Sequence, residues 1–148
     1  MRKYLLIILA VISISLKSND SKKDLLCHHW LQFASTSEIG APVKPTDASM
    51  AEEITIKPDG TYDESLYSGR MKMTGNWYLN DDETKMDFTI STLNGKDVSQ
   101  FNVTGRHFNI IILKLTTDTL IYGNEEYRGK EGRPMVYNHS DLYFVRKN

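Results

Sequence analysis

The stretch from Arg70 to Leu93, RMKMTGNWYLNDDETKMDFTISTL, constrains the fold more than any other part of the chain. Apolar residues recur at every second position on both sides of a polar segment at 80–83, with Gly75 among them. Such period-two spacing around a polar turn is typical of a half-buried β-hairpin. The apolar residues that share the predicted inward parity are Met71, Met73, Trp77, Leu79, Met86, Phe88 and Ile90.

Turn signals divide the rest of the chain into short strands. Pro58-Asp59-Gly60-Thr61 places a proline that fixes φ before a glycine that tolerates positive φ. Asn94-Gly95 is a strong signal for a two-residue hairpin turn. We expect a helical turn at 25–30, a long loop at 38–49, and further strands at 30–35, 54–56, 61–67, 98–103, 108–115, 119–127 and 135–146.

These elements predict an all-β fold of eight to ten short antiparallel strands. Consecutive hairpins favour an up-and-down meander, and closure into a barrel removes the exposed edges of such a sheet. A two-layer sandwich is the competing architecture. Residues 108–115 are apolar on both parities, so the pattern leaves their inward face open and is compatible with a bulge.

The N-terminus has the pattern of a secretory signal peptide. Arg2 and Lys3 precede an apolar run, Leu5 to Leu16, that is too short to span a bilayer. We therefore divide the chain into a cleaved signal at 1–18, a polar tether at 19–24 and one domain at 25–148. Cys27 follows the apolar run at a distance and lacks a small residue before it. This favours a soluble protein, periplasmic or extracellular, over a lipid-anchored one.

Charge and cysteine content argue against several classes of protein. Loss of Arg2, Lys3 and Lys17 with the signal changes the formal net charge from −1 to −4, which argues against nucleic-acid binding. The sequence after the signal contains no transmembrane segment and no basic amphipathic helix for a membrane surface. A single cysteine excludes an internal disulfide framework.

Five motifs in a fixed order carry a family resemblance. They are Leu25-Leu26-x-x-x-Trp30, residues 54–62 (ITIKPDGTY), residues 74–82 (TGNWYLNDD), residues 113–120 (LKLTTDTL) and residues 143–147 (YFVRK). Their order resembles that of small bacterial secreted lipocalin-like domains, relatives of the calycin barrels.

This resemblance implies an eight-stranded up-and-down lipocalin-like barrel with one end closed by side chains and the other open. It also implies that Trp30 packs against Arg146 of the last strand to close the barrel, a cation–π contact. The chain departs from the family pattern at His28, where lipocalins usually carry glycine, and in lacking an early anchoring cysteine.

The residues that could carry catalysis or bind metal form no convincing constellation. Cys27 to His29 are adjacent, so they cannot converge on one zinc ion. Residues 81–83 lack the ligand spacing of a calcium loop. Asp63, Glu64 and Asp97 are better explained as scattered surface acids than as an acid–base pair. We therefore predict a protein that is not an enzyme, with no catalytic residue, metal or cofactor.

The methionines and aromatic residues of the inward parity suggest a binding site. They either fill a closed core, for which an eight-stranded barrel is just wide enough, or line an apolar cavity. We favour an exported, non-enzymatic protein that binds a small apolar or amphipathic molecule. The predicted ligand-binding residues are Tyr62, Met71, Met73, Trp77, Met86, Phe88, Tyr122 and Phe144.

Two other functions are compatible with the pattern. One is a barrel with a solid core that acts as a protein-interaction or envelope-associated module through its loops. The interface residue types for it are Tyr127, Arg128, Arg133 and Tyr137. The other is a hydrolase or isomerase, which would need an acid and a histidine together inside the mouth of the barrel.

Overall fold

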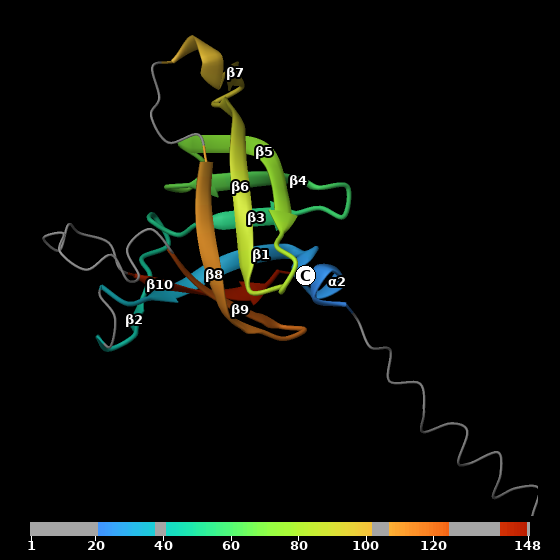
Figure 1. Cartoon of the computed structure of the whole chain (residues 1–148). Helices are drawn as coiled ribbons and strands as arrows, with labels where there is room; N and C mark the ends of the chain where they lie inside the picture. The colour runs from blue at the N-terminus through green and yellow to red at the C-terminus, as the bar shows by residue number, and fades with distance from the viewer. Residues whose placement is uncertain (1–20, 38–40, 102–106, 125–139, 148) are drawn as a thin grey trace, which may run out of the picture.

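A computed structural model of the chain describes residues 21–37, 41–101, 107–124 and 140–147 (Figure 1). The predicted signal peptide lies outside these residues. In the part described, no helix has the length and hydropathy needed to cross a bilayer. The elements are α2 (Lys22–Leu26), β1 (His29–Ser35), β2 (Lys44–Pro45), β3 (Glu53–Ile56), β4 (Thr61–Leu66), β5 (Met71–Leu79), β6 (Lys85–Leu93), β7 (Lys96–Asp97), the 3-10 helix η1 (Val98–Gln100), β8 (His107–Leu115), β9 (Thr119–Asn124) and β10 (Asp141–Arg146).

Eight of the strands close into one antiparallel barrel. Their order is β1-β3-β4-β5-β6-β8-β9-β10, and β10 pairs back onto β1. The two-residue strands β2 and β7 pair only with β1 and β6, outside this ring. Each barrel strand lies beside its neighbours in the chain, as in an up-and-down meander. The predicted barrel is therefore confirmed, and the sandwich is excluded.

The central hairpin forms as the alternation predicts. Trp77 pairs with Phe88 and Leu79 with Met86 across β5 and β6. The Asn80 side-chain oxygen closes the turn, because it accepts hydrogen bonds from the backbone N–H groups of Thr84 and Lys85 at 3.0 and 2.9 Å. Trp77 and Phe88 are both buried. The predicted turns at 58–61 and 94–95 also join strand pairs, with Gly60 and Gly95 at positive φ.

Gly75 allows two parts of the barrel to approach closely. The register between β5 and β6 shifts between Thr74 and Gly75, which marks a bulge. A Cβ atom at Gly75 would lie 1.9 Å from the backbone oxygen of Thr89 and 2.9 Å from Cε1 of Tyr62. Only glycine fits this position, where the Tyr62 ring packs directly on the backbone of β5.

The inward face of β8 changes at a second bulge. Phe108 and Ile110 pair with Phe88 and Met86, so they face the interior with them. The register with β9 then shifts between Ile112 and Lys114. This bulge explains why residues 108–115 are apolar on both parities.

The strand predicted at 98–103 is wrong where the structure describes it. Residues 98–100 form η1, and Phe101 follows as its C-cap. The Asp97 carboxylate accepts a hydrogen bond from the Ser99 backbone N–H at 2.7 Å. This local bond competes with strand pairing and stabilises the turn. The strands predicted at 119–127 and 135–146 are described only as β9 and β10, because residues 125–139 lie outside the described ranges.

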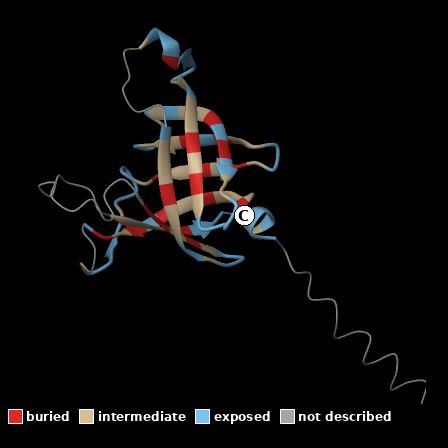
Figure 2. Ribbon diagram, in the orientation of Figure 1, coloured by how far each residue is buried: buried red, intermediate tan, exposed pale blue. Residues whose placement is uncertain are grey.

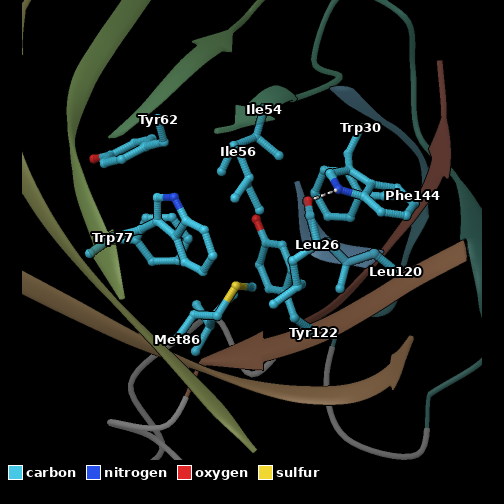
Figure 3. Close-up of a cluster of buried hydrophobic side chains, with 12 residues drawn as sticks. Leu26, Trp30, Ile54, Ile56, Tyr62, Trp77, Met86, Leu120, Tyr122 and Phe144 are labelled. Atoms are coloured by element: carbon cyan, nitrogen blue, oxygen red, sulfur yellow. Dashed lines mark hydrogen bonds between the residues drawn. The ribbon is translucent and has the colours of Figure 1, made fainter. Parts of the chain in front are cut away.

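One end of the barrel is closed by α2, which begins within the predicted tether. Ser21 caps the helix through a reciprocal pair of hydrogen bonds with Asp24. Trp30 is completely buried, and its indole N–H donates to the Leu26 carbonyl oxygen at 2.9 Å (Figure 3). Arg146 is the cross-strand partner of Trp30, as the resemblance implies, but its side chain is exposed. The indole of Trp30 is therefore covered by α2 and by its apolar neighbours.

Burial follows the alternation of the strands, which appears as successive red bands in Figure 2. Most of the buried apolar residues form one cluster inside the barrel. Its members are Leu26, Trp30, Ile54, Ile56, Tyr62, Trp77, Met86, Phe88, Ile110, Leu120, Tyr122 and Phe144.

Candidate functional site

Six of the eight predicted ligand-binding residues lie together in the barrel interior. Their rings pack in contact: Tyr62 meets Phe88 edge-on at 4.9 Å between centroids, and Tyr122 stacks on Phe144 at 5.0 Å. Figure 3 shows how most of this group converges. The six residues are Tyr62, Trp77, Met86, Phe88, Tyr122 and Phe144.

The remaining two predicted residues, Met71 and Met73, lie outside this cluster. Met73 pairs with Glu64 across β4 and β5, and Met71 pairs with Leu66. Both methionines are half-buried. They lie where β4 ends and β5 begins, which is the end of the barrel opposite α2.

A group of buried polar side chains, here called the acidic layer, adjoins the apolar cluster, and its two tyrosines belong to both groups. Its members are Gln32, Glu52, Tyr62, Glu64 and Tyr122. Glu52 is 7% exposed and immediately precedes β3, with the parity of inward-facing Ile54. Glu64 is 8% exposed and shares its parity on β4 with Tyr62. Two carboxyl groups are therefore buried inside the barrel, among mainly apolar side chains.

Hydrogen bonds hold one half of the acidic layer in place. The Tyr122 hydroxyl donates to Glu52 Oε1 at 2.5 Å. The Glu52 backbone N–H donates to Gln32 Oε1 at 3.1 Å, and the Gln32 backbone N–H donates to the Glu52 carbonyl oxygen at 2.9 Å. Glu52 is thus fixed by β1 and β9 at once.

The other half of the acidic layer lacks partners. Glu64 Oε2 and the Tyr62 hydroxyl oxygen are both inaccessible to solvent and make no hydrogen bond within the described structure. Figure 3 shows the Tyr62 hydroxyl pointing away from the apolar cluster. Buried polar atoms are almost always hydrogen-bonded, so these two atoms are exceptions within the described structure.

The buried environment of the acidic layer raises the pKa values of its ionisable members. Burial raises the pKa of Glu52 to about 7, although the hydrogen bond from Tyr122 acts in the opposite direction. Burial, and then the charge of Glu52, raise the pKa of Glu64 to about 8. Burial and the nearby carboxylates also raise the pKa of both tyrosine hydroxyls. At neutral pH the Glu64 carboxyl is therefore mostly protonated.

The interpretation of Glu64 as a surface acid is wrong, because its side chain is buried inside the barrel. Asp63 and Asp97, by contrast, are exposed, and Asp63 forms an ion pair with Lys57 at 2.6 Å. Sequence reasoning missed Glu52 altogether. The same alternation that placed Ile54 inward would have placed Glu52 inward too, and it would have placed Glu64 with Tyr62.

His29 and His107 have their printed partners outside the acidic layer. His29 Nε2 lies 3.1 Å from Glu53 Oε2, and Lys147 Nζ bonds the same carboxylate. His107 Nδ1 lies 2.9 Å from the Thr89 hydroxyl. Burial raises the pKa of the half-buried Cys27 thiol. Within the described ranges, no three histidine, cysteine or acidic side chains converge as a metal site would require.

A groove on the outer face lies between β1, the segment at 46–51 and the turn from β4 to β5. It has a volume of about 710 Å³, and Leu31 and Phe33 provide its apolar wall. Phe33 is 45% exposed. The predicted interface residues Tyr127, Arg128, Arg133 and Tyr137 lie outside the described residues, so that prediction stays open.

Comparison with known proteins identifies the fold. No model of a protein family and no curated protein matches the sequence. A crystal structure of a lipocalin-like protein from Bacteroides uniformis has a TM-score of 0.54, with 13% identity over 83% of this chain and 99% of that one. An NMR structure of another protein from Bacteroides uniformis has a TM-score of 0.51, with 18% identity over 85% and 92%. A crystal structure of a DUF4847 family protein from Bacteroides vulgatus also has a TM-score of 0.51, with 11% identity over 86% and 99%. The lipocalin-like fold predicted from the sequence motifs is confirmed.

Proposed function

We propose that this lipocalin-like barrel is a non-enzymatic binding protein that holds a small amphipathic molecule between the acidic layer and the end opposite α2. The observation that carries the proposal is the pair of buried, unpartnered polar atoms, Glu64 Oε2 and the Tyr62 hydroxyl. Aromatic side chains pack below them, and half-buried Met71 and Met73 lie at the same end. Ligand sites combine an apolar lining with a few convergent polar groups in this way.

Methionine suits the outer part of such a site. Its unbranched, polarisable side chain adapts to ligands of different shapes. The apolar body of the ligand would gain about 25 cal/mol for each Å² removed from water. The proposed location is the periplasm or the cell exterior, because the first 18 residues have the pattern of a secretory signal.

Displacement of a neutral fluorescent dye, N-phenyl-naphthylamine, tests the proposal. Dye fluorescence should rise on binding to the protein and fall when decanol is added. Met73→Trp would fill the proposed site and should weaken dye binding about tenfold or more, equivalent to ~1.4 kcal/mol. Tyr78→Trp is the matched control, because Tyr78 lies on the same strand but is 62% exposed on the outer face.

Equal dye binding by the two variants would place the dye elsewhere and contradict the proposal. Absence of dye binding to the unaltered protein would also contradict it. In that case the alternative function, protein interaction through the surface, gains support from the outer groove beside Phe33.

A further inference from the structure

A row of four side chains crosses the outer face of the barrel and lines the groove of about 710 Å³. Each member is the cross-strand partner of the next, so neighbouring side chains lie side by side. In order from β1 to β5, the members are Leu31, Glu53, Ser65 and Lys72. Ile54 and Glu64, which flank members of the row along β3 and β4, are buried, so the row faces outward. Adjacent strands lie about 4.8 Å apart, so roughly 14 Å separates the apolar end of the row from the basic end.

The β1 end of the groove is apolar. Phe33 has the same parity as Leu31 on β1, and 45% of its surface is exposed. Its ring is supported by Tyr143 of β10, which it meets edge-on with 6.3 Å between the centroids. Small side chains, Ala48 and Ala51, line the groove on the segment at 46–51. An exposed aromatic ring beside small side chains offers a flat surface on which another ring can pack.

The β5 end of the groove has a positive charge that is not balanced within the described structure. Lys72 takes part in none of the described ion pairs. Glu53, the acid of the row, is already engaged by Lys147 Nζ and His29 Nε2, each at 3.1 Å. The Lys72 side chain lies along the turn from β4 to β5, because its Cε is 3.9 Å from the place that a Cβ of Gly69 would take. The groove therefore combines an apolar wall with one excess cation.

We infer that this outer groove binds a small organic anion, a flat apolar ring system beside Phe33 that carries a carboxylate, sulfonate or phosphate group near Lys72. Small-molecule sites have volumes of about 300–1,000 Å³, and the groove falls within this range. The Ser65 hydroxyl, next to Lys72 in the row, is a further hydrogen-bond donor for the acidic group. The site is formed mainly by the outer faces of the strands, so it is separate from the interior site proposed above and does not depend on it.

The fluorescent dye anilinonaphthalene sulfonate, an aromatic body with one sulfonate, tests the site. Its fluorescence should rise on binding to the folded protein at neutral pH. Lys72→Gln should weaken dye binding about threefold, as expected for the loss of a partly exposed ion pair. Lys114→Gln is the matched control, because Lys114 is an exposed lysine on β8 that does not line the groove, and it should leave binding unchanged.

A second pair of variants tests the apolar end. Phe33→Ala should weaken binding of the sulfonate dye about fivefold or more, because the dye loses the ring on which it packs. Leu113→Ala is the control, since Leu113 is 41% exposed on β8 and does not line the groove. Urea unfolding checks that each variant is folded.

Competitors that share one ring system test the class of the ligand. Naphthoate, naphthyl phosphate and the neutral naphthamide would each be titrated against the bound sulfonate dye. Both anions should displace the dye at a concentration about threefold lower than the amide. This difference should disappear in Lys72→Gln, because the variant lacks the cation that distinguishes the competitors.

The site is overturned if the unaltered protein does not bind the sulfonate dye, or if either groove variant loses no more affinity than its control. Equal displacement by naphthoate and naphthamide would overturn the anionic class. Met73→Trp, which fills the proposed interior site, should leave binding of the sulfonate dye unchanged. Weaker binding in that variant would place the dye inside the barrel and overturn the outer site, whereas failure of N-phenyl-naphthylamine to bind concerns only the interior site.

Discussion

Replacement of Glu64 by glutamine should stabilise the folded protein at neutral and alkaline pH. Glutamine has nearly the shape of a protonated glutamate but cannot ionise. The pKa of Glu64 rises from 4.5 to about 8 in the folded protein, because the side chain is buried and close to Glu52. At 1.36 kcal/mol per pKa unit, ionising this carboxyl inside the barrel costs about 5 kcal/mol more than in the unfolded chain.

The direction of the pH dependence follows from this raised pKa. The unfolded chain loses the proton of Glu64 first, as the pH passes about 4.5. Stability contributed by the protonated carboxyl is therefore fully present below that pH and is lost as the pH rises toward 8. By pH 7 the loss amounts to about 3 kcal/mol, and Glu64→Gln avoids it. The variant should match the parent protein near pH 4.5 and exceed its free energy of unfolding by about 3 kcal/mol at pH 7.

Urea unfolding at several pH values provides the measurement. Trp30 and Trp77 are both buried in the barrel, so their fluorescence reports on the folded state. Glu53→Gln is the control with the opposite sign, because the hydrogen bond from Lys147 lowers the pKa of Glu53. That variant should lose stability at neutral pH. The reasoning is refuted if the difference between Glu64→Gln and the parent protein changes by less than about 1 kcal/mol between pH 4.5 and 8.

Two further substitutions test the packing around the acidic layer. Gly75→Ala should lower the free energy of unfolding by about 3 kcal/mol or more, because its Cβ would overlap the Thr89 backbone oxygen; the urea midpoint measures this. Tyr122→Phe removes the hydrogen bond to Glu52 and should cost about 1–3 kcal/mol, with a larger loss at pH 7 than at pH 5. Tyr78→Phe, on the exposed outer face, should show no such pH-dependent loss, and an equal loss in both variants would contradict the assigned bond.

The barrel could be predicted because local patterns determine most of it. Alternation fixes which side chains of β5 and β6 face inward, and turn residues fix where the chain reverses. Trp77 and Phe88 therefore pair as expected. The pattern fails where two structures compete locally. Asp97 forms a helical turn in place of the predicted strand, because its side chain offers the backbone a nearby hydrogen-bond partner.

The inward face of β8 was not predictable for a different reason. A bulge shifts the parity within the strand, and its position depends on pairing with β9. Sequence periodicity assumes one residue on each strand for every step along the ladder, so it cannot locate such a shift when both parities are apolar.

The acidic layer was misjudged because a general tendency was given more weight than the pattern. Charged side chains are rarely buried, so Glu64 was assigned to the surface. Its parity with Tyr62 indicated the opposite, and the parity of Glu52 with Ile54 did the same. When an acidic residue falls on the inward parity of a strand, burying its side chain has an energetic cost. Acidic residues buried in this way concentrate at functional sites.

The two ends of the barrel differ in how their buried polar groups are satisfied within the described structure. Toward α2, the buried indole groups are satisfied: Trp30 donates to the Leu26 carbonyl oxygen, and Trp77 donates to the Lys57 carbonyl oxygen at 2.9 Å. Toward the other end, Glu64 and Tyr62 keep buried oxygen atoms without partners. Apolar replacements for a buried charged group often increase stability, so retention of two carboxyls is not explained by folding alone. Glu52 is held by Tyr122, whereas Glu64 Oε2 has no partner in the described structure, and that atom is the one on which the proposed function depends.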